Sequence, residues 1–343
     1  MITFASDYTT GAHPEVLRRL VETNLEGLEG YGADPYCESA KAKIRQAVGV
    51  PEAQVELLTG GTQTNAIVIA TMLADHEGVV AAETGHINTH EAGAIEYTGH
   101  KVLPLHHHAG KLDAEEVRAY LEAFFADDSR EHMVYPGMVY VSHPTEYGTL
   151  YSLAELTALS AVCRRYDLPL FVDGARLAYA LSSRETDVTL ADLGRLADVF
   201  YIGGTKCGAL CGEAIVFTHG NRPPHFLNAV KKRGALLAKG RLLGVQFDAL
   251  FSDDLYGRIG RHAIEMASRL KEIFASRGYE FYLPSPTNQQ FVVMPNDRLS
   301  AFGAKIGYTV WQPYDATHTV IRLATSWSTT EADLAALAEA LDA

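Results

Sequence analysis

The chain of 343 residues is poor in cysteine, in positive charge and in long apolar runs. Its four cysteines, at positions 37, 163, 207 and 211, form no CxxC pair, and free thiols are the expectation for an intracellular chain of this size. The most apolar run, near residues 65–74, is too short to span a bilayer. The first eleven residues lack the basic start and apolar stretch of a secretory signal. We therefore expect a soluble, cytoplasmic protein with no membrane partner.

Basic residues are outnumbered, with 29 lysines and arginines against 42 acidic residues and a net charge of -13. Only residues 231–241 gather several of them, so no broad basic face for nucleic acid is expected. The GxGxxG and GxxxxGK[ST] patterns are also absent, which disfavours dinucleotide and P-loop sites. Three consecutive histidines at 106–108 could, with His90, suggest a metal hydrolase. They lie in a polar stretch that is more typical of an exposed loop, and we expect no metal site.

The pattern that is present is a regular alternation of short apolar runs and helical segments. Runs of this kind, nearly apolar throughout, predict a mostly parallel sheet covered on both faces. After about residue 245 the pattern changes to a long amphipathic helix at 255–278, four short strands and a last helix. We therefore predict an α/β fold with a large domain at 1–245 and a small C-terminal α+β domain at 246–343. The apolar runs lie at 78–83, 101–105, 138–143, 168–173, 197–204 and 213–218.

Ligands of such sheets bind beyond the carboxyl ends of the strands, which directs attention to the residues after each run. Lys206 follows one of them in the stretch YIGGTKCGALCGEA, and the nearest acid along the chain is Glu213. Buried lysine is rare unless it is paired. Either Lys206 reaches solvent from a loop, or its amine is a reagent whose lowered pKa allows it to form a Schiff base.

Two further strand ends offer groups for a planar, phosphorylated ligand. Gly60, Gly61 and Thr62 lead into a helix whose N-terminus could hold a phosphate, or they form an ordinary turn capped by Thr62. His86 could stack on a planar ring or cap its own turn. The neighbouring His90 and Glu91 are predicted to be local polar groups of a helix.

Charged groups follow two other strands. Asp173 could face a protonated ring nitrogen while Arg176 binds a substrate carboxylate, or Arg176 could simply be the cation that pairs with Asp173. Arg322, from the small domain, would add a second carboxylate ligand. Together with Lys206 these are the parts that pyridoxal phosphate requires, and a non-enzymatic binding protein would not explain their arrangement.

The ordered motifs of the chain resemble those of the L-threonine aldolases, which are part of the β-eliminating lyase group of fold type I pyridoxal phosphate enzymes. The likeness runs over nearly the whole chain, and it is the order of the set that is specific. The motifs are FASDYTTGAHPEV, EGYGADPYCESAKAKI, GGTQTN, ETGHINTHEAGA, FVDGARL, GGTKCG and IRLATSW.

The resemblance implies a role for each candidate residue. It implies a homo-oligomer, dimer or tetramer, with active sites between subunits, so that residues far from the cavity of one chain could reach a neighbour's cofactor. It also leaves three candidates for the base that removes the proton of the β-hydroxyl: His86, His143 and a water molecule. The implied roles are Schiff base at Lys206, ring-nitrogen partner at Asp173, ring stacking by His86, phosphate binding by Gly60, Gly61 and Thr62, cofactor and carboxylate binding by Arg176, carboxylate binding by Arg322 with help from Ser6, substrate contact by His143, and contacts to the neighbouring subunit from Tyr31 and Arg241.

One segment departs from the family pattern. Threonine aldolases usually carry Thr-His-Asn before the Asp strand, and here the matching stretch is VYVSHPTEYGTLYS, with Thr145 or Glu146 at the position of that histidine. GGTKCG also replaces the family's Ser-x-Ser-Lys. The expected activity is cleavage of a β-hydroxy-α-amino acid, such as threonine or allo-threonine, to glycine and an aldehyde. β-Elimination from a cysteine- or serine-type amino acid, or amino-group transfer, are the alternatives.

Overall fold

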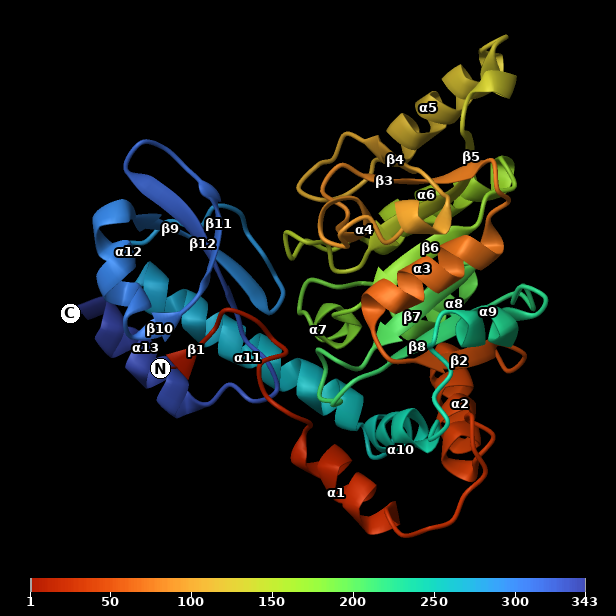
Figure 1. The fold of residues 1–343 in the computed structure, drawn as a ribbon. Coiled ribbons are helices and arrows are strands. Elements are labelled where there is room, and N and C mark those ends of the chain that lie inside the picture. Colours follow the sequence, from red (N-terminus) through yellow and green to blue (C-terminus); the bar gives the residue numbers. More distant parts are fainter. Residues whose placement is uncertain (1, 343) are drawn as a thin grey trace.

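A seven-stranded sheet forms the centre of the computed structural model, which describes residues 2–342 (Figure 1). The strand order is β2-β8-β7-β6-β5-β3-β4, and β8 runs antiparallel to both of its neighbours while the other adjacent pairs are parallel. The strands are β2 (Gln54–Leu58), β3 (Glu77–Ala82), β4 (Val102–Leu105), β5 (Tyr135–Ser142), β6 (Leu170–Gly174), β7 (Val199–Gly203) and β8 (Glu213–Phe217).

Apolar side chains from both faces of these strands are buried. Val139 and Val141 of β5 join one apolar cluster, whereas Met138 and Tyr140 join the other, because successive side chains of a strand point to opposite faces. Each fully buried side chain of this kind stabilises the fold by about 1.5–3 kcal/mol. The strands therefore read as continuous apolar runs in the sequence, as expected for a sheet covered on both faces.

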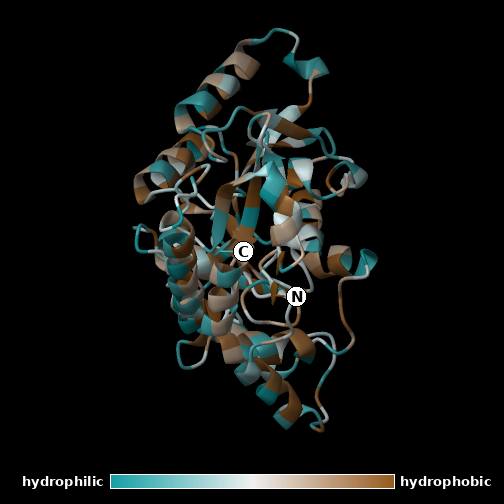
Figure 2. Ribbon diagram, turned by 90° about the vertical axis from the view of Figure 1, so that its left-hand side faces the viewer, coloured by the Kyte–Doolittle hydropathy of each residue, from teal (hydrophilic) through white to brown (hydrophobic). Residues whose placement is uncertain are grey.

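Helices cover both faces. On one face lie α3 (Gly61–Met72) and α9 (Phe226–Lys232), and on the other lie most of the remaining helices. Brown and teal alternate along these helices, as expected for elements with one buried side (Figure 2). The short helix α4 (His86–Thr89) shares the apolar cluster of α3 and α9 through Ile87. The remaining helices up to residue 275 are α1 (Pro14–Thr23), α2 (Pro35–Val48), α5 (Ala114–Ala126), α6 (Leu153–Arg165), α7 (Leu177–Leu181), α8 (Leu190–Leu196), α10 (Arg241–Leu250) and α11 (Leu255–Ala275).

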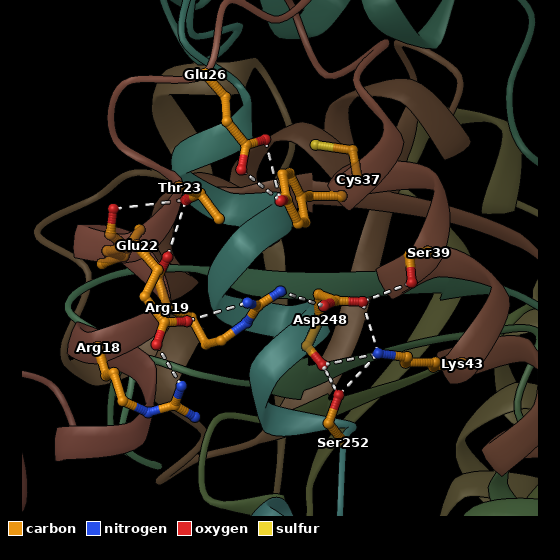
Figure 3. A network of polar contacts seen from close by, with 12 residues as sticks. Arg18, Arg19, Glu22, Thr23, Glu26, Cys37, Ser39, Lys43, Asp248 and Ser252 are labelled. Atoms are coloured by element: carbon orange, nitrogen blue, oxygen red, sulfur yellow. Dashed lines mark hydrogen bonds and ion pairs between the residues drawn. The ribbon is translucent and has the colours of Figure 1, made fainter.

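A polar network joins α1, α2 and α10 (Figure 3). Asp248 of α10 is nearly buried, and its Oδ1 accepts hydrogen bonds from Ser39 Oγ at 2.6 Å and from Lys43 Nζ at 2.7 Å. Arg19 of α1 lies 3.9 Å from the second oxygen. Because a nearly buried carboxylate needs such partners, this network fixes how the three helices pack.

The C-terminal part has its own sheet and apolar cluster. Its antiparallel order is β11-β12-β9, covered by α12 (Asn296–Gly303) and α13 (Glu331–Asp342). The N-terminal strand β1 (Ile2–Thr3) pairs with β10 (Ile306–Gly307), so the first residues lie beside the C-terminal part (Figure 1). The strands of the sheet are β9 (Gln289–Pro295), β11 (Thr309–Pro313) and β12 (His318–Ala324).

Most predicted elements are present, with one difference. The first of the four short strands expected after the helix at 255–278 is reduced to a single bridge between Phe281 and Val292, because the chain there only touches the edge formed by β9. The division into 1–245 and 246–343 stays a prediction, and α10 continues through residue 245.

All four cysteines are free, as expected. Within residues 2–342, no helix combines the length and the apolar character that crossing a membrane requires.

Candidate active site

A cavity of about 690 Å³ lies at the carboxyl ends of the parallel strands, between the central sheet and the C-terminal part. Its walls combine the loops after β2, β3, β5, β6 and β7 with β11 and β12. This is the location expected from the topology. Of the residues singled out from the sequence, it brings together Gly60, Gly61, Thr62, His86, Asp173, Arg176, Lys206 and Arg322.

Small residues allow the strand ends to approach one another. A Cβ added at Gly174 would lie 2.0 Å from the carbonyl oxygen of Tyr201, and one added at Gly203 would lie 2.3 Å from that of Ala175. Both glycines end strands that carry functional side chains, Asp173 on β6 and Lys206 just after β7. The glycines thus permit the close spacing of β6 and β7 on which the site depends.

Asp173 is buried at the end of β6, yet it is held as an anion. Its carboxylate accepts hydrogen bonds from the hydroxyls of Tyr140 at 2.5 Å and Tyr201 at 2.6 Å, and from Asn65 Nδ2 at 3.2 Å. Burial opposes ionisation, but the nearby His86 and the two tyrosine hydroxyls outweigh it and keep the pKa of Asp173 below its ordinary value. The site therefore presents a fixed negative charge to whatever occupies the cavity.

Lys206 carries a free amine. Within residues 2–342, its Nζ makes no hydrogen bond or ion pair, whereas its backbone oxygen accepts a hydrogen bond from Tyr179 at 2.5 Å. Burial lowers the pKa of Lys206, and the positive charge of Arg176 adds to this effect. A lowered pKa increases the fraction of neutral amine, which is the nucleophilic form.

His86 is oriented by a buried acid. Its Nδ1 lies 2.9 Å from Glu91 Oε1, which also accepts a hydrogen bond from Asn65 Nδ2 at 2.8 Å. His90 stacks on the imidazole, with 5.8 Å between the ring centroids. The sequence interpretation of His90 and Glu91 as local helix groups is wrong, since both line the cavity and Glu91 fixes the ring of His86.

Arg176 does not pair with Asp173. Its Nε and Nη2 donate to the two carboxylate oxygens of Asp7 at 2.6 and 3.0 Å, and Asn288 Nδ2 donates to the same aspartate at 2.9 Å. Among the described residues, Nη1 of Arg176 has no partner. Burial opposes the charge on the guanidinium, but Asp7 outweighs it and raises the pKa of Arg176. The ion pair between Arg176 and Asp173 considered from the sequence is therefore excluded, and Nη1 of Arg176 stays available to a ligand.

Arg322 approaches the cavity from β12. Its Nη2 donates to the carbonyl oxygen of Ala5 at 3.0 Å, and its Nε is buried with no partner inside the described part of the chain. The guanidinium lies 5.9 Å from the ring centre of Trp311. Burial, reinforced by Arg176, lowers the pKa of Arg322, so this side chain would gain from an anionic partner.

Four candidates from the sequence do not line the cavity: Ser6, Tyr31, His143 and Arg241. His143 is fully buried, and its Nδ1 accepts a hydrogen bond from the backbone nitrogen of Tyr151 at 3.4 Å. Burial lowers the pKa of His143 to about 4. The contact expected between His143 and the substrate is therefore not supported by its position, because the side chain is fully buried and is not part of the cavity wall.

The other three lie in different surroundings. The Ser6 hydroxyl is buried without a partner in residues 2–342. Arg241 donates to the carbonyl oxygens of Thr23 and Glu26, and Tyr31 is 55% exposed. Their predicted contacts with a cofactor in a neighbouring subunit stay predictions.

Sequence reasoning assigned no role to Glu213, which also lines the cavity. The residue begins β8, and because β8 is antiparallel, its start lies at the same edge as the ends of its neighbours, opposite Leu58 and Gly203. Burial raises the pKa of Glu213 to about 8. A search limited to the residues that follow each strand does not find Glu213, because it is the first residue of its strand.

The fold and the site have counterparts among solved structures. A threonine aldolase structure from Leishmania major superposes with a TM-score of 0.96, at 40% identity and covering 100% of this chain and 99% of that chain. An aspartate aminotransferase from Thermus thermophilus superposes with a TM-score of 0.71 at 16% identity, over 99% of this chain and 91% of that one. The chain therefore has the fold of the fold type I pyridoxal phosphate enzymes, as predicted.

Sequence comparison then defines the family. Residues 3–294 match the model of the beta-eliminating lyases, and this chain belongs to that family. A low specificity L-threonine aldolase from a Pseudomonas species is 31% identical over 98% of this chain and 95% of its own length. A second, from Pseudomonas aeruginosa, is 30% identical over 88% of this chain and 87% of its own.

Proposed function

We propose that this chain is a pyridoxal phosphate-dependent aldolase that cleaves a β-hydroxy-α-amino acid, such as threonine or allo-threonine, to glycine and an aldehyde. The observation that carries the proposal is the meeting of Lys206, Asp173 and two arginines in one cavity. The similarity to threonine aldolases over nearly the whole chain supports this choice among the activities of the family.

The residues of the cavity fit pyridoxal phosphate. Gly60 is extended at the start of α3 and no side chain caps this helix, so its first N–H groups are available for a phosphate. A Cβ at Gly61 would lie 3.1 Å from the Tyr201 hydroxyl, so only a residue without a larger side chain fits at this end of the helix. Asp173 would hold the ring nitrogen in its protonated form, His86 would stack on the ring, and Lys206 Nζ would bind the aldehyde.

The same cavity can orient an amino-acid substrate. When bound, pyridoxal phosphate supplies an electron sink for the bond that breaks at Cα. Nη1 of Arg176 and the guanidinium of Arg322 are the cations available for the substrate carboxylate, and Ser6 lies in the same N-terminal segment as Asp7. Two cations on one carboxylate fix which bond of Cα faces the ring, and this choice separates aldol cleavage from other reactions.

Product analysis tests this proposal. Supplied with pyridoxal phosphate, the protein should release glycine and acetaldehyde in equal amounts from L-threonine or L-allo-threonine, and Lys206→Ala should release neither. Release of 2-oxobutanoate and ammonia instead would assign β-elimination. Conversion of the cofactor to its amine form without glycine would assign amino-group transfer. Either result would contradict the aldolase assignment.

We also propose that the chain forms a homo-oligomer with sites near the subunit interface. The support is an exposed apolar surface on α1 and the loop after it, where Leu17, Val21 and Leu25 are 48%, 68% and 95% exposed. Exposed apolar side chains grouped in one segment are typical of interaction surfaces. Arg241 belongs to the same region, since it donates to the carbonyl oxygens of Thr23 and Glu26, and the backbone nitrogen of Tyr31 donates to the carbonyl oxygen of Ala238 just before Arg241.

A further inference from the structure

Glu146 is a carboxylate of the cavity wall with one oxygen anchored and the other free. It lies in the loop after β5, and its Oε1 accepts a hydrogen bond from the backbone nitrogen of His86 at 3.0 Å and another from Ser142 Oγ at 2.7 Å. Within residues 2–342, no group donates to Oε2. Because Glu146 lines the cavity, Oε2 is the oxygen left to face its contents.

The surroundings of Glu146 favour exchange of a proton at that oxygen. Burial raises the pKa of Glu146, and the negative charge of Asp173 raises it further, whereas Ser142 and His86 act in the opposite direction. Tyr140, Tyr147 and Tyr151 are the other titratable groups near it. Oε1 already receives two hydrogen bonds, so an added proton belongs on Oε2. A pKa raised toward neutrality is what general acid–base catalysis requires.

Four other titratable groups of the cavity wall, His86, His90, Glu91 and Glu213, each have an atom engaged by a neighbouring protein group. The Nδ1 of His86 is held by Glu91, and that of His90 lies 2.6 Å from Thr89 Oγ1. Glu91 bridges His86 and Asn65, and Oε2 of Glu213 accepts a hydrogen bond from the backbone nitrogen of Gly204. His143 is fully buried and does not line the cavity.

We propose that Glu146 is the general base that removes the proton of the substrate's β-hydroxyl, through Oε2. This inference rests on the proposed aldolase function. In this step the O–H bond breaks and its electron pair forms the C=O bond of the aldehyde. The Cα–Cβ bond breaks at the same time, and its electron pair remains with the glycine fragment. Glu146 then releases its proton to solvent, Cα takes a proton from solvent, and the net reaction consumes no proton.

The decisive variant is Glu146→Gln, which keeps an oxygen for His86 and Ser142 but removes the base. A positioned base is typically worth ~10²–10⁴-fold, so kcat for threonine cleavage should fall by roughly that factor with a smaller change in KM. Glu146→Asp, which retains a carboxylate at a shorter reach, should recover part of the loss. Glu83→Gln, at an exposed acid after β3 that does not line the cavity, is the matched control and should behave as the wild type.

Two readouts separate a base from a structural role. Exchange of the α-hydrogen of glycine with D2O, followed by NMR, requires the cofactor and Lys206 but no β-hydroxyl, so Glu146→Gln should retain it. Cofactor affinity, measured by absorbance titration, should also be unchanged. Loss of exchange or affinity together with cleavage would show that Glu146 only supports the fold of the site and would overturn the proposal.

The same experiment distinguishes the two levels of inference. A wild-type protein that exchanges glycine but does not cleave threonine would end the aldolase proposal, and with it the substrate on which Glu146 is inferred to act. A wild type that cleaves threonine while Glu146→Gln cleaves equally fast would end the assignment of Glu146 alone.

Thermal unfolding of the apoprotein adds a readout independent of activity. Because the pKa of Glu146 is raised in the folded protein, the free energy of unfolding of the wild type should decrease as pH rises from the pKa of an unfolded glutamate to that of Glu146. Glu146→Gln should not show this decrease.

Discussion

At the scale of single residues, the site depends on a buried charge that is kept by hydrogen bonds. Asp173 has three side-chain donors from three different elements, Asn65 of α3, Tyr140 of β5 and Tyr201 of β7, and a fourth donor in the backbone nitrogen of Ala175. The three side-chain donors are all distant from Asp173 in the sequence. The charge is available to the cavity because these donors compensate for the cost of burial.

Removing that charge should separate cofactor binding from turnover. In Asp173→Asn the tyrosine hydroxyls can still bind the side-chain oxygen, but the negative charge opposite the ring nitrogen is lost. We expect the cofactor to remain attached to Lys206 while kcat falls by about 10²-fold or more, the size of effect seen for other electrostatic groups. Attachment is measured by borohydride trapping and turnover by aldehyde release. Unchanged turnover would remove Asp173 from this role.

His143 should make the stability of the fold depend on pH. Its pKa is lowered to about 4 by burial, so the unfolded chain binds a proton below pH 6.5 while the folded chain does not. The free energy of unfolding should therefore decrease as pH falls from about 6.5 to about 4. His143→Asn lacks this proton, and its thermal midpoint, relative to the wild type, should improve over the same interval. A constant difference between the two proteins would contradict the assignment.

At the scale of elements, the strand ends β6 and β7 must approach closely. In Gly203→Ala the new Cβ would meet the carbonyl of Ala175 at 2.3 Å, so one of the strands has to shift. The expected loss of unfolding free energy is roughly 1–3 kcal/mol, the usual cost of overpacking. Gly27→Ala is the control, since nothing lies within 4 Å of a Cβ there, and its effect should stay within about 0.5 kcal/mol. Chemical denaturation measures both, and equal values would exclude this account of Gly203.

The elements also show what the sequence can and cannot predict. Runs of apolar residues correctly indicated the parallel strands, and the groups that follow them, Lys206, Asp173 and His86, are brought to one cavity. Glu213 escaped attention because it begins an antiparallel strand. The partner of Arg176 is Asp7, 169 positions away, and no local spacing indicates such a contact.

At the scale of the whole molecule, the N-terminal segment ties the two parts together. Asp7 accepts hydrogen bonds from Arg176 of the large part and from Asn288, just before β9, while β1 pairs with β10 (Figure 1). The two arginines proposed to bind the substrate carboxylate, Arg176 and Arg322, therefore both contact the N-terminal segment, at Asp7 and at Ala5. The order of the motifs could be recognised from the sequence, but this long-range connection could not.

The proposed oligomer can be tested by complementation. Lys206→Ala lacks the amine, whereas Arg241→Ala alters a residue outside the cavity of its own chain. If Arg241 acts on a neighbouring subunit, mixed oligomers of the two inactive variants should contain some intact sites and regain activity. Sedimentation should show an oligomer for both. A monomer, or a mixture that stays inactive after verified exchange of subunits, would contradict the interfacial site.

The most direct test of the central claim is the site of attachment of pyridoxal phosphate. The purified protein, supplied with the cofactor, is reduced with borohydride, digested and mapped by mass spectrometry, together with Lys206→Ala. The account predicts a visible absorbance band and a single labelled residue, Lys206, with neither in the variant. A protein that remains colourless, or a label on another lysine, would contradict the account.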